Sequence, residues 1–366
     1  MRGAARLLLI LAAASFVAFA APAQDQYPPT TGQEQYFQEP GAKPKFTLDW
    51  DFLARYDQVD HREYFERLER GRFQLRPEVG FEPISNLRIA VRAIFNYSTQ
   101  EHSDPFVDNY IARQAAIERY YVLWKPGQFS LRGGAFGMPL FATQMLWDRD
   151  IQTPGAAGAW ESRDGAWTLA AAWFYGPQHD HDHSQIFAGQ AVWRSGDLGP
   201  FRLEAGAAYW SFDLRNLRTL YIRENTPSIV DGTTGYLYGY HVADLLVRTR
   251  FRLGNVPFLD SLDGIRNFSA PNGKRLAFEG AVVAGQLVTP WRWQASYAYQ
   301  YVQRDALVGA YNSDDWWWHT WFEGHRITLA LTVLPQVYVQ GSVSFNRRLD
   351  QKYWLNRYMV DLVKMF

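Results

Sequence analysis

The sequence predicts an all-β fold, a transmembrane antiparallel β-barrel of about 16 strands, with 14 strands as the alternative. Three observations predict it. Apolar and polar side chains alternate along many long segments, and short connections between these segments alternate with long ones. Beyond the N-terminus, no segment supplies the roughly 20 uninterrupted apolar residues that a membrane-spanning helix needs.

The overall composition narrows the classes of function. The chain has 366 residues, of which 37 are basic and 37 acidic, and it has no cysteine. The balanced charge gives no reason to expect a nucleic-acid partner. The lack of cysteine excludes disulfides, thiolate metal sites and thiol nucleophiles. The 15 Trp and 21 Tyr exceed what core packing usually needs and suit the aromatic girdles of a barrel.

The N-terminus predicts export. Two arginines precede an apolar run over residues 7–20, and small residues at 21–23 offer a cleavage site. We therefore expect a cleaved signal peptide at 1–23. Residues 24–44 are rich in Gln, Pro and Gly and predict a periplasmic N-terminal arm. The barrel itself is expected over 45–366.

The first strands have the clearest alternation. Within 46–56 the residues Phe46, Leu48 and Trp50 share one face, while Asp49 and Asp51 share the other. Successive side chains of a strand point to opposite faces, so one face is apolar and the other charged. The same pattern returns in eight further segments: 73–82, 87–97, 201–211, 242–253, 275–285, 291–303, 325–334 and 336–346. The stretches 117–136 and 156–194 alternate less cleanly.

The connections support a barrel and allow its strands to be counted. Short connections at 83–86, 125–128, 162–165, 285–290 and 335 predict periplasmic turns, and long ones near 57–70, 98–115, 137–155 and 304–323 predict outer loops. Counting from each terminus makes the strands at 201–211 and 242–253 run in the same direction. An additional strand is therefore expected between 212 and 240, with 217–223 as the best candidate, which brings the total to sixteen.

The C-terminal segment predicts the closing strand. Tyr358, Val360, Leu362 and Phe366 share its lipid face. A final Phe after such alternation resembles the strand that outer-membrane barrels present to the barrel-assembly machinery. Lys364 falls on the same apolar face, and we expect its long side chain to reach the interface.

The segment 136–155 carries a family resemblance. Its elements are a glycine-ended strand, a short apolar stretch and the pattern Trp-Asp-x-Asp followed by a glycine at 155. Together with 121–124 and 131–134, it resembles the "putative porin" family of bacterial outer-membrane barrels, and alginate-export-type barrels are a near alternative. The resemblance implies passive diffusion through a channel and says little about the solute.

The predicted lumen face is rich in arginine. We predict that it includes these pore-lining residues: Arg72, Arg76, Arg88, Arg92, Arg248, Arg250, Arg252 and Glu78. Arginine in a pore favours anions, which predicts a mild anion bias. The alternative is that arginines and acids pair across strands and only stiffen the wall.

The long loop at 137–155 is the predicted constriction. Its first half is apolar, and Trp147, Asp148, Arg149 and Asp150 follow. If the loop folds into the barrel, Trp147 packs against the wall and the charged triplet narrows the channel. The alternative is an outer loop held down by its own aromatic side chains.

Two other clusters have less specific patterns. His179, His181 and His183 alternate with Asp, and imidazole with carboxylate suits a transition metal. We interpret this cluster as a solvated loop and predict neither a metal site nor a cofactor. Trp316, Trp317 and Trp318 could stack on sugar rings, but we favour the aromatic belt at the outer interface.

Taken together, these features predict a non-enzymatic outer-membrane channel for small hydrophilic solutes, because no nucleophile and base have a spacing that singles them out. A conduit or scaffold for a polysaccharide or an electron-carrying periplasmic protein is the alternative, and an outer-membrane hydrolase comes third. The expected partners are outer-membrane lipid and lipopolysaccharide, the barrel-assembly machinery through Phe366, and small solutes, but not nucleic acid. Diffusion barrels are commonly trimers, so a homotrimer is a candidate assembly.

Overall fold

The structure is a computed structural model that describes residues 44–60, 68–99, 113–175, 184–196, 201–214, 223–230 and 233–364. The signal peptide, the arm up to residue 43, the histidine cluster at 179–183 and Phe366 lie outside these residues, so what the sequence predicts for them stays a prediction. No helix in the described ranges is long and apolar enough to cross a membrane.

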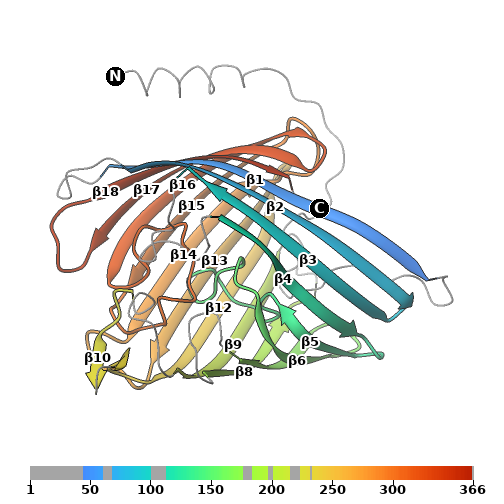
Figure 1. Cartoon of the computed structure of the whole chain (residues 1–366), viewed down its shortest axis with the longest axis horizontal. Helices are drawn as coiled ribbons and strands as arrows, with labels where there is room; N and C mark the ends of the chain where they lie inside the picture. The colour runs from blue at the N-terminus through green and yellow to red at the C-terminus, as the bar shows by residue number, and fades with distance from the viewer. Residues whose placement is uncertain are drawn as a thin grey trace.

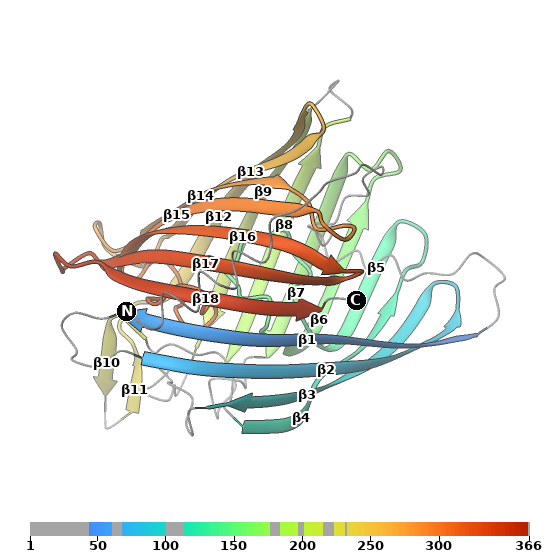
Figure 2. The same cartoon turned by 90° about the horizontal axis from the view of Figure 1, so that it is seen from above.

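Sixteen antiparallel strands of the described chain form one closed barrel, which confirms the predicted fold class. The last strand pairs with the first along nine residue pairs from Phe52↔Lys364 to Asp60↔Asn356, and Figure 2 shows the two side by side. The barrel strands are β1 Lys45–Asp60, β2 Leu68–Ile84, β3 Leu87–Ser98, β4 Arg113–Trp124, β5 Phe129–Phe136, β6 Thr153–Glu161, β7 Trp167–Tyr175, β8 Gln185–Arg194, β9 Arg202–Asp213, β12 Tyr240–Leu253, β13 Val256–Asn267, β14 Leu276–Gly285, β15 Trp293–Val302, β16 Phe322–Leu334, β17 Val337–Arg348 and β18 Leu355–Lys364.

The alternation in the sequence translates directly into an outer and an inner face. Phe46 and Leu48 on β1 are each 73% exposed on the outside, whereas Arg55 and Asp57 of the same strand are buried inside. Outward-facing apolar side chains recur around the barrel and form the lipid-facing band that a membrane barrel requires. The predicted phases of β1, β2, β3 and β12 are all confirmed.

The strand count is confirmed, but the predicted position of the additional strand is wrong. β9 pairs directly with β12 from Phe212↔Tyr240 to Arg202↔Arg250, so no barrel strand lies between them. Residues 217–222 of the best candidate, 217–223, lie outside the described residues. The short strands β10 (Pro227–Val230) and β11 (Thr233–Tyr236) form a separate hairpin at one end of the barrel (Figure 1).

The overlooked strand is β13. Asp260, Gly264 and Arg266 fall on its lipid-facing side among Phe258 and Leu262, so the apolar period is broken three times within one strand. It follows β12 after a two-residue turn in which Gly254 adopts a positive φ of 59°. Such a tight turn is a short connection of the kind expected on the periplasmic side.

A β-bulge explains the unclear alternation after residue 117. The pairing of β3 with β4 passes from Arg92↔Arg119 to Ala93↔Ile117, which leaves Glu118 as the extra residue. Both Glu118 and Arg119 then ion-pair with lumen side chains, Glu118 with Arg92 and Arg119 with Glu78. A bulge shifts the phase of the strand, so a strict period of two cannot hold across it.

Candidate functional site

Two loops enter the barrel and meet inside it. The first loop, 137–152, connects β5 to β6, and the second loop, 303–321, connects β15 to β16. The indole of Trp147 stacks on the ring of Tyr311 with centroids 4.7 Å apart. The backbone N–H of Asp148 donates to the carbonyl of Tyr311 at 2.6 Å, and that of Ser313 donates to the carbonyl of Gln144 at 3.0 Å. The two loops therefore form one continuous internal layer.

The first loop begins on the wall formed by β8, β9 and β12. Phe141 is fully buried, and its N–H and C=O both hydrogen-bond to the amide of Gln190, at 2.8 and 2.6 Å. Its ring lies so close to Gly206 that a Cβ there would come within 2.6 Å of it. The guanidinium of Arg248 covers the ring at 4.5 Å. These contacts fix the loop by backbone and side chain together.

The same loop ends against the opposite wall. The carboxylate of Asp150 accepts a hydrogen bond from Arg76 of β2 at 2.7 Å. Between the two anchors, Trp147 packs against Trp210 and Phe174, with ring centroids at 6.2 and 5.4 Å. The loop thus crosses the lumen from β9 and β12 to β2.

The second loop is anchored by carboxylates that directly precede its tryptophans. Asp315 accepts from Arg55 at 3.0 Å and from Arg326 at 3.1 Å, and Asp314 accepts from Arg72 at 3.2 Å. Trp316 is buried inside the barrel beside Arg326, so its interpretation as part of the outer aromatic belt is wrong. The two acids that directly precede the tryptophans are the feature of the sequence that argues against a lipid-facing belt, because charged side chains are unfavourable next to lipid.

The predicted lumen arginines of β2 and β3 all face inward and all lie in ion-pair networks. Arg88 donates to Glu82 at 2.9 Å and to Glu78 at 3.2 Å, and its side chain is fully buried. In the same way Arg76 pairs with Asp51 at 2.5 Å, and Arg92 with Glu118 at 2.7 Å. On these strands the arginines therefore form ion pairs with carboxylates, which is the alternative to a surplus of positive charge in the lumen.

The arginines of β12 have a different environment. Arg248 donates to the carbonyl of Ala142 at 3.1 Å, and Arg252 donates to the carbonyl of Asn255 at 3.2 Å. Arg250 lies 3.5 Å from Glu204, which also binds Arg194 at 3.3 Å. Two of these three arginines thus hydrogen-bond to neutral carbonyl groups, whereas Arg76, Arg88 and Arg92 hydrogen-bond to carboxylates.

The two acids of the charged triplet in the first loop, Asp148 and Asp150, have pKa values that are shifted in opposite directions. Burial, followed by repulsion from Asp150 and Asp314, raises the pKa of Asp148 to about 8. Burial would also raise the pKa of Asp150, but the guanidinium groups of Arg76 and Arg149 lower it to about 2. At neutral pH, Asp148 is therefore mostly protonated while Asp150 is ionised.

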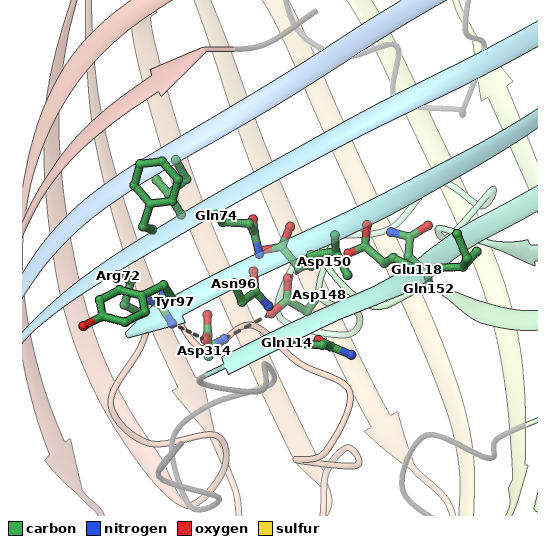
Figure 3. A pocket seen from close by; sticks show the side chains of 14 residues that line it. Arg72, Gln74, Asn96, Tyr97, Gln114, Glu118, Asp148, Asp150, Gln152 and Asp314 are labelled. Atoms are coloured by element: carbon green, nitrogen blue, oxygen red, sulfur yellow. Dashed lines mark hydrogen bonds and ion pairs between the residues drawn. The ribbon is translucent and has the colours of Figure 1, made fainter. Parts of the chain in front are cut away.

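A cavity of about 220 Å³ lies between the first loop and the inner face of β2, β3 and β4 (Figure 3). Its lining includes residues of all three strands and of both loops. The polar lining residues are Arg72, Gln74, Asn96, Gln114, Glu118, Asp148, Asp150, Gln152 and Asp314. Among the described residues, no group of three or more His, Asp and Glu side chains is arranged to hold a metal ion.

Comparison with known proteins finds matches only at the level of structure. No protein-family model matches the sequence, and no curated protein matches it. Among the similar solved structures, OprB of Pseudomonas putida has a TM-score of 0.61 at 10% identity, over 88% of this chain and 94% of that one. OccAB1 of Acinetobacter baumannii has a TM-score of 0.54 at 8% identity, over 90% and 98% of the two chains. A BenF-like porin of Pseudomonas fluorescens Pf-5 has a TM-score of 0.51 at 10% identity, over 88% and 99%. The chain therefore has the closed-barrel fold of bacterial outer-membrane porins and the apolar outer surface of an outer-membrane protein.

Proposed function

We propose that this protein is a porin-like outer-membrane channel through which small hydrophilic solutes diffuse. The observation that carries the proposal is the first loop, which crosses the lumen from Phe141 to Asp150 without forming part of the barrel wall. A polar, charged lumen behind an apolar outer face suits water and hydrophilic solutes. In this proposal Trp147, Asp148, Arg149 and Asp150 form the constriction.

The mild anion bias is part of the proposal, and we assign it to the arginines of β12 rather than to those of β2 and β3. Arg248, Arg250 and Arg252 occupy alternate positions of one strand and form a ladder that leads to the turn at 254–255. Rings and rows of arginine raise the local concentration of anions. The paired arginines near Glu78 contribute little net field.

The internal layer argues against the polymer conduit. Both loops are anchored to the wall by buried contacts, so a polysaccharide chain or a partner protein would have to displace Trp147 and Tyr311. We therefore propose a channel for small solutes only. Embedding in lipid and lipopolysaccharide, recognition of Phe366 by the assembly machinery and a homotrimer belong to the same proposal.

Planar-bilayer recording tests the proposal. Purified, refolded protein should insert in discrete conductance steps, and a potassium chloride gradient should give a reversal potential displaced toward that of chloride. Detergent carried through the same refolding without protein is the control. The absence of steps would contradict the channel, whereas steps with a potassium-directed reversal potential would contradict only the anion bias.

A further inference from the structure

The cavity of Figure 3 contains a row of side-chain amides. Gln74 of β2 pairs in register with Asn96 of β3, and Asn96 pairs with Gln114 of β4. Register partners on one face of a sheet lie next to each other, so the three amides form a row across three strands. Gln152 of the first loop lines the same cavity.

Three of these amides have a buried polar atom with no hydrogen-bond partner. They are Oε1 of Gln74, Nδ2 of Asn96 and Oε1 of Gln152. The other end of the Gln152 amide is engaged, because its Nε2 donates to the carbonyl of Arg149 at 3.2 Å. Buried polar groups favour a hydrogen-bond partner, so three such atoms around one cavity give its wall the capacity to bind a polar ligand. Together they offer two acceptors and one donor.

The charges around the cavity are compensated within the protein. Asp150 is bound by Arg76 at 2.7 Å, Glu118 by Arg92 at 2.7 Å, and Asp314 by Arg72 at 3.2 Å. The raised pKa of Asp148 makes the remaining acid neutral near pH 7. The charged side chains of the lining are thus paired with opposite charges, whereas three of its amide atoms have no partner, so the cavity favours a neutral hydrogen-bonding solute over a charged one.

We propose that this cavity binds an uncharged solute that carries several hydroxyl groups. A hydroxyl both donates and accepts, so neighbouring hydroxyls can satisfy Gln74, Asn96 and Gln152 at the same time. Ile94, which is buried on the same inner face, supplies an apolar contact for the carbon atoms of the solute. This inference rests on the proposed channel function and names the class of solute that the channel retains on its way through.

The probe is myo-inositol, a neutral ring with a hydroxyl on each carbon. Added to single channels in potassium chloride, it should reduce the current in a saturable way. Triethylene glycol dimethyl ether, which is neutral but has no hydroxyl, should reduce the current only in proportion to solution conductivity. Gln74→Leu and Asn96→Leu should each raise the half-blocking concentration of myo-inositol by about three- to tenfold, because each removes one neutral hydrogen bond.

Gln294→Leu is the matched control, since Gln294 faces the lumen from β15 outside the cavity lining. It should leave the half-blocking concentration unchanged. Equal block by both solutes, or equal behaviour of all three variants, would overturn the inference while leaving the channel intact. If no conductance is seen at all, calorimetric titration of myo-inositol into the detergent-solubilised protein and its Gln74→Leu variant still decides whether the cavity binds this solute.

Discussion

Asp148 is a residue of the first loop at which burial and neighbouring charge both act on one carboxyl group. Its carboxyl is held by the N–H groups of Asp150 and Asp314, at 3.0 and 3.3 Å, yet both residues also bring a negative side chain close to it. Because its pKa is about 8, the group is neutral at pH 7 and negative at pH 9. A negative charge in the proposed constriction opposes anions, so we expect the proposed anion preference to fall as the pH rises from 7 to 9. Reversal potentials at the two pH values measure this change.

Asp148→Asn provides the sharper form of this test, because it removes the titrating group and keeps its shape. In this variant the reversal potential should change little between pH 7 and 9. The control is Asp164→Asn in the turn between β6 and β7, where the hydroxyl of Ser162 lowers the pKa of the carboxyl, so that it is already ionised at pH 7. The Asp164 variant should keep the response of the unmodified protein, and a response that persists in Asp148→Asn would contradict the assignment.

A second residue-scale feature joins the two ends of the barrel sheet. Arg55 of β1 and Asp361 of β18 are register partners, and their side chains meet at 2.7 Å in a buried pair. Asp361→Ala removes the two hydrogen bonds that Arg55 donates to Asp361 and leaves Asp315 as the remaining carboxylate partner of Arg55. Because a hydrogen bond to a charged group contributes about 1.5–3 kcal/mol, Asp361→Ala should lower the free energy of unfolding by about 1.5–3 kcal/mol or more, measured by urea titration in detergent or lipid.

The matched control for this loss is the more exposed pair of Arg348 and Asp350, whose atoms meet at 2.5 Å. Surface pairs contribute only about 0–1 kcal/mol, so Asp350→Ala should unfold at nearly the same urea concentration as the unmodified protein. Equal losses in both variants would show that barrel closure does not depend on the buried pair.

At the scale of elements, the sequence predicts strands well where both faces are uniform. The sequence predicts β1 and β3 with the correct phase because the apolar positions of these strands face lipid and the charged positions face the lumen. β13 escaped prediction because Asp260, Gly264 and Arg266 interrupt its lipid face. The phase of β4 was unclear because Glu118 is an extra residue in a bulge. An extra residue or a polar residue on the lipid face changes or hides the alternation of side chains, and the sequence pattern does not show where this happens.

The first loop supports the element-scale prediction about the constriction. Trp147 is buried between Phe174, Trp210 and Tyr311 and joins the loop both to the wall and to the second loop. Trp147→Ala removes this packing, which costs about 3–5 kcal/mol for a buried tryptophan. We expect a larger and noisier single-channel conductance, because the loop loses its fixed position.

Trp173→Ala is the control. Trp173 directly precedes Phe174 in β7, but its side chain is 40% exposed on the outer face of the barrel, whereas Phe174 is buried inside. This variant should leave both the size and the noise of the conductance steps unchanged. If Trp147→Ala conducts like the unmodified protein, then the first loop does not set the narrowest part of the channel.

At the scale of the whole molecule, the sequence shows which charges face the lumen but not how they are distributed. Arg88 and Arg252 occupy the same phase of the alternation, yet Arg88 lies between Glu82 and Glu78 whereas Arg252 donates to the carbonyl of Asn255. That difference depends on strand register and on the path of the two loops, neither of which is periodic. The sequence also fails to predict that the second loop lies inside the barrel. Arg55 and Arg72, which hold Asp315 and Asp314 of this loop, are more than 240 residues away from them in the chain.

The uneven distribution of charge makes the last prediction specific to the whole barrel. Replacing Arg252 by Gln removes a positive charge from the wall of β12, so the reversal potential in a salt gradient should move away from that of chloride. Replacing Arg88 and Glu82 together by Gln removes one charge of each sign from a pair that is already compensated at 2.9 Å, so the reversal potential should stay where it is. Circular dichroism of both refolded variants must first show the unmodified strand content. A larger shift in the Arg88 and Glu82 double variant than in Arg252→Gln would place the selectivity on β2 and β3 and contradict the assignment to β12.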